Sequence, residues 1–224
     1  MTAISIVVNT HNEEKRIGRL LDDLNKQSHQ HFEVIVIDSN SEDKTCDVAR
    51  GFGQALPTIT VKKLKQHGVS FARNVGAQLA KYERLLFLDA DVRLTPTFLS
   101  DAIYQLEKKK VDIAGAYMKA DNLSLGYHLG YTAINTGLFV TSFFFPTIVG
   151  ACMFSTQRVH REIGGFNENI TQCGECDYTR RAAQTWRYRM IPVSFGFDPS
   201  RLRQNGWIKM AATYLKANIA LRFY

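Results

Sequence analysis

The sequence is poor in cysteine and proline, with four and five of them among 224 residues. Four cysteines in a chain of this length do not build a disulfide framework, which favours a reducing, cytoplasmic setting. Proline is scarce and the chain has no repeats and no low-complexity stretch, so repeat architectures and long linkers are excluded. We therefore expect one domain over residues 1–224.

The chain also lacks a stretch with the composition of a signal peptide or a convincing membrane span. The opening MTAISIVVNTHNEEK has no basic region before its apolar run and turns polar at Asn9. The most apolar stretch, residues 137–154, is interrupted by Thr, Ser and Pro146. Burial in the core is its main interpretation. Shallow contact with a bilayer, at the cytoplasmic face of the membrane, or with a hydrophobic acceptor stays open.

Acidic residues are fewer than basic ones, 21 against 28, which gives a formal net charge of +7. A basic balance favours anionic partners such as nucleic acid, acidic lipid headgroups or phosphorylated small molecules. Charge alone does not choose among them.

Apolar strand-like runs alternate with amphipathic helical segments in the first half of the chain. The expected strands are AISIVV, FEVIVID, TITVKKL and RLLFLDA, and the expected helices cover residues 13–27, a short stretch ending near Gly51, and residues 69–82. Asn12 is expected to cap the first helix. This alternation predicts an α/β fold with a mostly parallel central sheet, Rossmann-like, and helices on both faces.

The second half is less regular. A helix is expected from Pro96 to the EKKK run, then the strand VDIAGAYM, the helix ECDYTRRAAQTW, the strand RYRMIPV and an amphipathic helix in residues 201–224. Residues 120–150 are aromatic and punctuated by glycine, and they give no clear prediction.

Polar side chains follow three of the expected parallel strands, where ligands of such sheets bind. These are Thr10 to Asn12, Asp38 to Asn40, and Asp89 with Asp91. In an extended segment, residues two apart project to the same side, so Asp89 and Asp91 can face one ligand. Two carboxylates suit Mg²⁺ or Mn²⁺ when phosphate oxygens and water complete the coordination. A solvated turn is the alternative.

Five motifs in order resemble family 2 glycosyltransferases of the GT-A type, over almost the whole chain. They are ISIVVNTHNEEKRI, VIVIDSNSEDKT, GVSFARNVGAQLA, LLFLDADV, and IGGFNEN followed by GECDYTRRA. Two positions depart from the usual pattern near the start, with Asn9 in place of proline and His11 in place of an aromatic residue.

The resemblance implies roles for these residues. Residues 1–95 would bind a nucleotide sugar, and residues 96–200 an acceptor. Asp38 would accept hydrogen bonds from a uracil-type or guanine-type base, and Asp91 would ligate the metal directly, with Asp89 on the ribose or a metal-bound water. The implied nucleotide-sugar-binding set is Thr10, His11, Asn12, Asp38, Arg73 and Asp89, together with Arg203 and Trp207 in the tail.

The catalytic base is expected in GECD, which departs from the Glu-Asp-x-Asp pattern of the family. Alignment on Arg181 puts Glu175 where the catalytic aspartate normally lies and Gly174 where glutamate is usual. A glutamate can act as general base if it reaches the acceptor hydroxyl. We favour Glu175 over Asp177, and the alternative is that both only favour the start of a helix.

Cys173 and Cys176 have the spacing of a redox pair or of two zinc ligands. A zinc site needs further ligands, for which Cys152 and His160 are the nearest candidates in the sequence. Packed, reduced thiols are the main interpretation.

The sequence thus predicts a Mn²⁺- or Mg²⁺-dependent, inverting glycosyltransferase. It would move a sugar from a UDP- or GDP-sugar to a hydroxyl of a saccharide or lipid-linked acceptor. A non-catalytic nucleotide- or nucleic-acid-binding protein of the same fold is the alternative, although we expect no specific nucleic-acid partner. A sugar nucleotidyltransferase is disfavoured because no glycine precedes Gly18, where a phosphate loop would lie.

Overall fold

The computed structural model describes residues 2–119, 125–142 and 146–197. The strands are β1 (Ile4–Thr10), β2 (Phe32–Asp38), β3 (Ile59–Lys63), β4 (Arg84–Asp89), β5 (Val92–Arg93), β6 (Ile113–Met118), β7 (Cys152–Thr156) and β8 (Tyr188–Phe197). The helices are α1 (Ile17–Asn25), α2 (Thr45–Arg50), α3 (Val69–Leu79), α4 (Phe98–Lys109), α5 (Leu125–Thr141), α6 (Gln157–Glu162) and α7 (Gly174–Ala183). The expected tail helix, with Arg203 and Trp207, lies outside the described residues.

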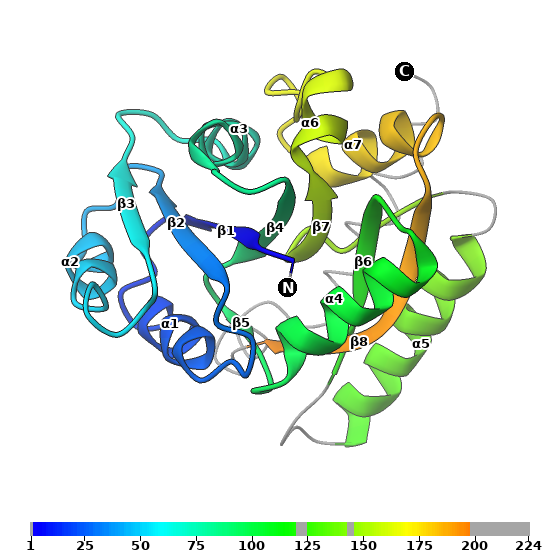
Figure 1. Cartoon of the computed structure of the whole chain (residues 1–224), viewed down its shortest axis with the longest axis horizontal. Helices are drawn as coiled ribbons and strands as arrows, with labels where there is room; N and C mark the ends of the chain where they lie inside the picture. The colour runs from blue at the N-terminus through cyan, green and yellow to red at the C-terminus, as the bar shows by residue number, and fades with distance from the viewer. Residues whose placement is uncertain (1, 120–124, 143–145, 198–224) are drawn as a thin grey trace.

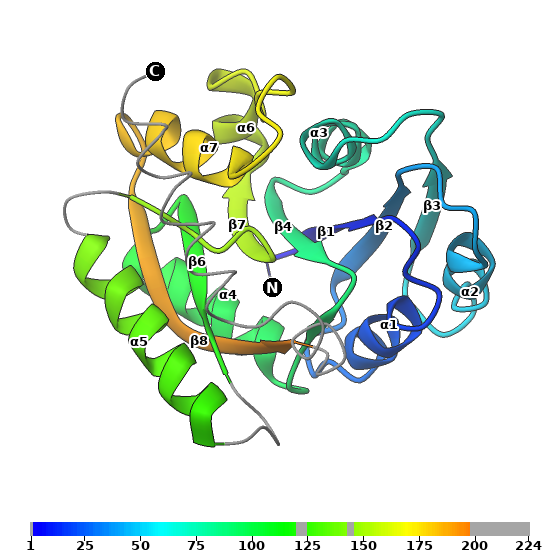
Figure 2. The same cartoon turned by 180° about the vertical axis from the view of Figure 1, so that it is seen from behind.

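The strands form one curled sheet in the order β3-β2-β1-β4-β7-β6-β8-β5. Strands β3, β2, β1 and β4 pair in parallel, as the alternation of strands and helices predicts. Strand β7 runs antiparallel to both β4 and β6 and joins the two halves of the sheet. Figures 1 and 2 show α3, α6 and α7 on one face of the sheet, with α1 and α4 on the other. The predicted α/β architecture is confirmed.

The first helix begins later than the sequence predicts. The structure starts α1 at Ile17, and the residue before it, Arg16, makes no side-chain cap. Asn12 instead has a left-handed backbone (φ 53°), and its side-chain oxygen accepts a hydrogen bond from the Glu42 amide at 2.9 Å. The prediction that Asn12 caps a helix is therefore wrong, because its side chain ties two loops together.

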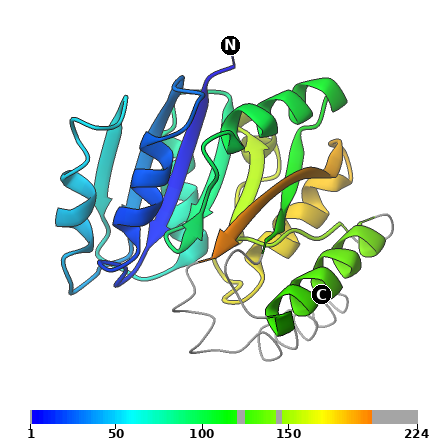
Figure 3. The ribbon, with the colours of Figure 1, turned by 90° about the horizontal axis from the view of Figure 1, so that it is seen from below.

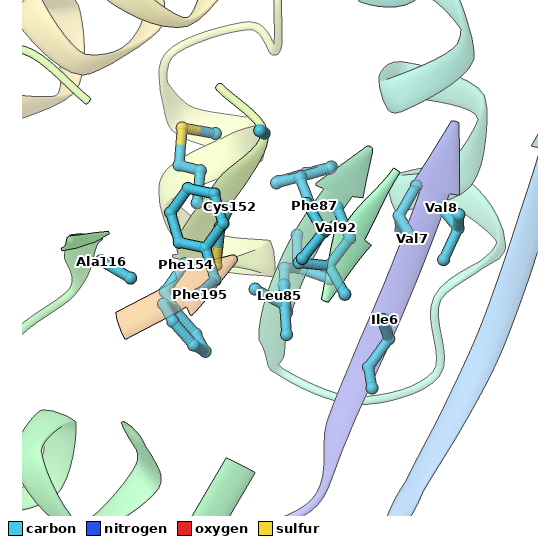
Figure 4. Packing of buried hydrophobic residues seen from close by; sticks show 14 of the residues in the cluster. Ile6, Val7, Val8, Leu85, Phe87, Val92, Ala116, Cys152, Phe154 and Phe195 are labelled. Atoms are coloured by element: carbon cyan, nitrogen blue, oxygen red, sulfur yellow. The ribbon is translucent and has the colours of Figure 1, made fainter. Parts of the chain in front are cut away.

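The core lies between the sheet and its helices. Strands β1 and β2 are almost wholly buried, which matches their near-continuous apolar sequence. Apolar side chains of neighbouring strands meet there, among them Val7, Phe87 and Phe154 (Figure 4). Helix α3 approaches β1 closely at Gly76, where an added Cβ would lie 2.2 Å from Val7 Cγ1. Close packing at Gly76 therefore holds α3 against the sheet.

The apolar stretch 137–154 is divided between two elements. It contains the end of α5, and it contains the start of β7, where Cys152, Met153 and Phe154 are fully buried. Core burial is therefore confirmed for the β7 part. Phe139 and Val140, on α5, are about half exposed. Among the described residues no helix has the length and apolar character needed to cross a bilayer.

Candidate active site

The ends of β1, β2 and β4 meet at one edge of the sheet. In the strand register Thr10 lies opposite Asp38, and Asn9 lies opposite Asp89. Neighbouring strands are about 4.8 Å apart, so these polar groups gather within one short arc. Figure 3 shows the three strands side by side. The sequence prediction that these strand ends come together is therefore correct.

Asp38 lies at the end of β2 and is fully buried. One carboxylate oxygen accepts a hydrogen bond from the Thr10 hydroxyl at 3.1 Å and one from the Ser41 hydroxyl. The other accepts from the Ser41 amide at 2.9 Å. These bonds offset the cost of burying the charge and fix the turn that follows β2.

His11 and Asn12 are exposed next to this buried cluster. The His11 ring packs edge-on against His67, with 4.6 Å between ring centroids. His67 comes from the loop between β3 and α3, so two loops present imidazole rings at the same edge of the sheet. The edge therefore combines a rigid carboxylate cluster with exposed rings that a planar group can contact.

Asp89 ends β4, and a turn at Ala90 and Asp91 separates it from β5. The expectation of one extended segment with both carboxylates on the same side is therefore wrong at this point. The side chain of Asp89 is 26% exposed, whereas Asp91 is 1% exposed. Two carboxylates on one short turn are hard oxygen donors, and this donor set fits a divalent cation such as Mg²⁺ or Mn²⁺.

Arg73 projects from α3 and is 3% exposed. Its Nη2 donates to Asp89 Oδ1 at 3.2 Å and to the carbonyl oxygen of Gly150 at 2.7 Å. Its Nη1 lies 3.7 Å from Glu175 Oε2. The guanidinium also lies over the Phe166 ring, 5.3 Å from its centroid. A single buried cation thus joins the strand-end aspartate to the predicted base.

Glu175 lies in the first turn of α7 and is 7% exposed. The backbone of Gly150 packs directly against it, since an added Cβ at Gly150 would lie 2.6 Å from Glu175 Cδ. The glycine and Arg73 together hold this carboxylate beside Asp89.

Asp177 is placed differently. Its carboxylate accepts two hydrogen bonds from Arg181, at 2.8 and 2.6 Å. Arg181 also donates to the carbonyl oxygens of Ile163 and Gly165, so Asp177 belongs to a network that ties α7 to the turn after α6. This i,i+4 ion pair therefore occupies Asp177 Oδ2 with two hydrogen bonds from one side chain.

All four cysteines are reduced thiols, as the sequence predicts, with Cys173 half-buried and the others buried. Across the described residues, one group of three or more His, Cys, Asp or Glu side chains is close enough to share a metal ion, and it joins Cys173 and Cys176 to Glu175. Neither Cys152 nor His160, the nearest candidates in the sequence for further zinc ligands, belongs to this group.

Three residues at the site were not assigned to it from the sequence. Asn9 Nδ2 donates to Asp89 Oδ1 at 3.1 Å, Gly150 packs against Glu175, and His67 packs against His11. The sequence did mark Asn9 as unusual, because it stands where the family usually has proline. Nothing in the sequence marked Gly150 or His67, since each acts through a contact that only the folded chain creates.

A cavity of about 390 Å³ lies elsewhere, between α4 and β8, and is lined by Phe98, Tyr104 and Pro192 among others. None of the predicted site residues in the described part of the chain lines it. We therefore place the site at the strand ends rather than in this cavity.

Solved proteins share this fold. TarS from S. aureus aligns with 88% of the chain at a TM-score of 0.74 and 22% identity, and the chain covers 36% of it. The mannosyltransferase PcManGT from Pyrobaculum calidifontis, solved with GDP-Man and Mn²⁺, aligns with 96% of the chain at a TM-score of 0.73 and 20% identity. The chain covers 63% of that protein. The architecture is thus that of GT-A glycosyltransferases.

The profile described as Glycosyl transferase family 2 matches residues 5–167, and the chain belongs to this family. Among curated relatives, a 4,4'-diaponeurosporenoate glycosyltransferase of Staphylococcus haemolyticus is 36% identical over 105 residues, which are 46% of the chain and 28% of the relative. Glycosyltransferase AglE of Haloferax volcanii is 25% identical over 189 residues, which are 80% of the chain and 60% of the relative. The chain thus spans less than two thirds of the length of each of these relatives.

Proposed function

We propose that this protein is a metal-dependent, inverting glycosyltransferase that moves a sugar from a nucleotide diphosphate sugar to an acceptor hydroxyl. The observation that supports this best is the position of Arg73 between Asp89 and Glu175. It brings a strand-end aspartate and a candidate base beside one buried positive charge, where a diphosphate leaving group and an acceptor can meet. Family membership agrees with this arrangement.

The donor would lie along the ends of β1, β2 and β4. In the proposal the base of a UDP- or GDP-sugar packs against His11 and Asn12, while the buried Asp38 and Thr10 keep the adjoining turn rigid. PcManGT was solved with GDP-Man and a TarS fragment with UDP-GlcNAc. Both nucleotides are therefore the first to test. The roles of Arg203 and Trp207 in the tail stay predictions.

Asp91 and Asp89 would hold a Mn²⁺ or Mg²⁺ ion, which would stabilise the charge that develops on the diphosphate when the glycosidic C–O bond breaks. Arg73 adds a fixed positive charge next to Asp89. A preorganised cation of this kind stabilises developing negative charge without reorganisation during the reaction.

Glu175 is the proposed general base. The acceptor hydroxyl oxygen would attack the anomeric carbon in line with the departing diphosphate, and Glu175 would take the hydroxyl proton. Such an attack inverts the anomeric centre. Asp177 is disfavoured for this role because Arg181 already binds it in two hydrogen bonds.

Helix α5 offers a surface for an apolar acceptor or for peripheral contact with a membrane. Leu129, Phe139 and Val140 are each more than half exposed on it. Eleven residues make about three helical turns, so Leu129 and Val140 share one face. We propose that this face contacts lipid, at the cytoplasmic side of the membrane. The double variant Leu129→Ser/Val140→Ser should co-sediment with anionic vesicles less than the wild-type protein does. Equal co-sedimentation of the two proteins would contradict this proposal.

The transfer reaction tests the choice of base. Glu175→Gln is expected to lower the rate of sugar transfer by about 10²–10⁴-fold, the usual contribution of general base catalysis, while donor affinity stays within a few-fold. Asp177→Asn serves as the matched control and should cost mainly stability. Loss of transfer in well-folded Asp177→Asn, with Glu175→Gln active, would reverse the assignment.

A non-catalytic nucleotide-binding or nucleic-acid-binding protein is the second candidate, because Gly174 and Glu175 depart from the usual sequence of the base motif. This candidate predicts that no sugar is transferred. If the partner is nucleic acid, the chain should bind oligonucleotides with an affinity that falls steeply as the salt concentration rises. We expect only weak, nonspecific binding.

A further inference from the structure

The first turn of α7 brings three potential metal ligands together. The Sγ atoms of Cys173 and Cys176 and a carboxylate oxygen of Glu175 all lie within 4.8 Å of one another. Cys173 is half-buried, whereas Glu175 and Cys176 are buried. An ion could therefore enter from the side of Cys173 and be enclosed by the other two ligands.

The local backbone explains why these side chains converge. The Cys176 amide donates to the carbonyl oxygen of Cys173 at 3.0 Å, which closes the first turn of the helix over this residue. Cys173 itself has a left-handed backbone (φ 57°), which is uncommon for a residue other than glycine. The close approach of Gly150 keeps the carboxylate of Glu175 against the same turn.

The spacing suits a small tetrahedral ion. A Zn–S bond is about 2.3 Å long, so two sulfur ligands of tetrahedral zinc lie about 3.8 Å apart. A cluster whose ligand atoms are at most 4.8 Å apart closes on such an ion by a shift of about 1 Å, which side-chain rotation can supply.

Charge supports a thiophilic cation. Two thiolates and a carboxylate around a divalent cation leave one net negative charge, and the buried Arg73 guanidinium lies 3.7 Å from Glu175 to balance it. Soft sulfur ligands select Zn²⁺ or Co²⁺ over Mg²⁺, so the cluster differs in preference from the hard oxygen donors Asp89 and Asp91.

We propose that Cys173, Glu175 and Cys176 form a binding site for a thiophilic divalent cation of the Zn²⁺ type, with water in the fourth position. Binding releases the two thiol protons, so the affinity rises with pH. The ion takes the Glu175 carboxylate as a ligand. If Glu175 is the base, as the proposed function has it, occupancy of this site stops sugar transfer.

Titration of the reduced chain with Co²⁺ tests the site without any activity. Wild-type protein should develop a thiolate-to-cobalt charge-transfer absorption with an endpoint of one ion per chain, and Zn²⁺ should displace it. The absorption should be lost in Cys173→Ala and in Cys176→Ala. Cys46→Ala is the matched control and should keep it, because Cys46 is a buried thiol on α2, outside the cluster.

Glu175→Gln should keep the sulfur absorption but bind Co²⁺ at least tenfold more weakly. The proposal is overturned if reduced wild-type protein shows no thiolate absorption, or if the absorption survives in both Cys173→Ala and Cys176→Ala. Cys173 is half-buried, so Cys173→Ala should fold. This variant therefore still tests the proposal if Cys176→Ala, at a buried position, does not fold.

A transfer assay then separates this proposal from the assignment of the base. In excess Mg²⁺, micromolar Zn²⁺ should lower the wild-type transfer rate at least tenfold, whereas Cys173→Ala, compared with itself without zinc, should lose this sensitivity. If Co²⁺ binds as described but Zn²⁺ leaves wild-type transfer unchanged, the site stands and Glu175 is not the base.

Discussion

At the scale of single residues, glycines determine how closely the elements of the proposed active site approach one another. Gly150 lies against Glu175, and Gly174 lies against α3, where an added Cβ would be 2.8 Å from Ser70 Oγ. A residue with a Cβ at position 174, such as the usual glutamate of the family motif, would require the Ser70 side chain or α7 to shift. Gly174 thus permits the close approach of α7 to α3 at Ser70.

Gly150→Ala tests the role of this close packing. The new methyl group would meet the Glu175 carboxyl group at 2.6 Å, so the carboxylate must move. A displacement of about 1 Å can cost about 10²-fold in rate, and we expect a loss of sugar transfer of roughly that size. The transfer rate is measured beside the melting temperature, to separate displacement from unfolding.

Gly137→Ala, in α5, is the matched control because an added Cβ meets nothing within 4 Å there. It should stabilise the helix by about 0.5–1 kcal/mol and keep the transfer rate within about twofold. Equal rates for Gly150→Ala and wild type would contradict the position assigned to Glu175.

At the scale of elements, α3 links the core to the site. It carries Gly76, which packs on Val7 of β1, and three residues earlier it carries Arg73, which contacts Asp89 and Glu175. Residues three apart in a helix lie on one face, so the contact that sets the height of α3 above the sheet also sets the position of Arg73.

Gly76→Ala should push α3 away from β1, because the added methyl would lie 2.2 Å from Val7 Cγ1. Overpacking of this kind costs about 1–3 kcal/mol of unfolding free energy. Val7→Ala removes the methyl groups that collide, so the double variant should be more stable than the sum of the single effects predicts. Urea unfolding of all four proteins measures this coupling, and strict additivity would contradict the close contact.

The elements also show what the sequence could predict. The four early strands alternate with helices, and the buried run FEVIVID coincides with β2. Strand β7 was not predicted because residues 137–154 are apolar without a clear period, and the end of α5 and the start of β7 share that character. Arg73 and Glu175 are remote in sequence, so their contact depends on the packing of α3 and α7, which no local pattern encodes.

At the scale of the whole molecule, protonation of buried groups links stability to pH. His160 is 7% exposed and is packed among the rings of Phe87, Phe166 and Tyr178. Burial and, to a smaller extent, the positive charge of Arg181 together lower the pKa of His160 from 6.5 to about 4. The folded chain therefore favours neutral His160.

The unfolded chain takes up a proton on this histidine near pH 6.5, whereas the folded chain resists it until about pH 4. Stability from neutral His160 is therefore complete above pH 6.5 and is lost as the pH falls toward 4, by up to about 3 kcal/mol. Urea unfolding between pH 7 and pH 4 should show this decline. His160→Leu should flatten it, and an unchanged slope in that variant would rule out His160 as the cause.

The central claim is that a nucleotide diphosphate binds at the ends of β1, β2 and β4 together with a divalent cation. Calorimetric titration of the chain with UDP and with GDP, each with and without Mn²⁺, tests this claim most directly. The account predicts that one nucleotide binds with micromolar affinity, that this binding needs Mn²⁺, and that Asp91→Asn abolishes it. Binding of neither nucleotide by folded protein, or metal-independent binding unchanged in Asp91→Asn, would contradict the proposed donor site.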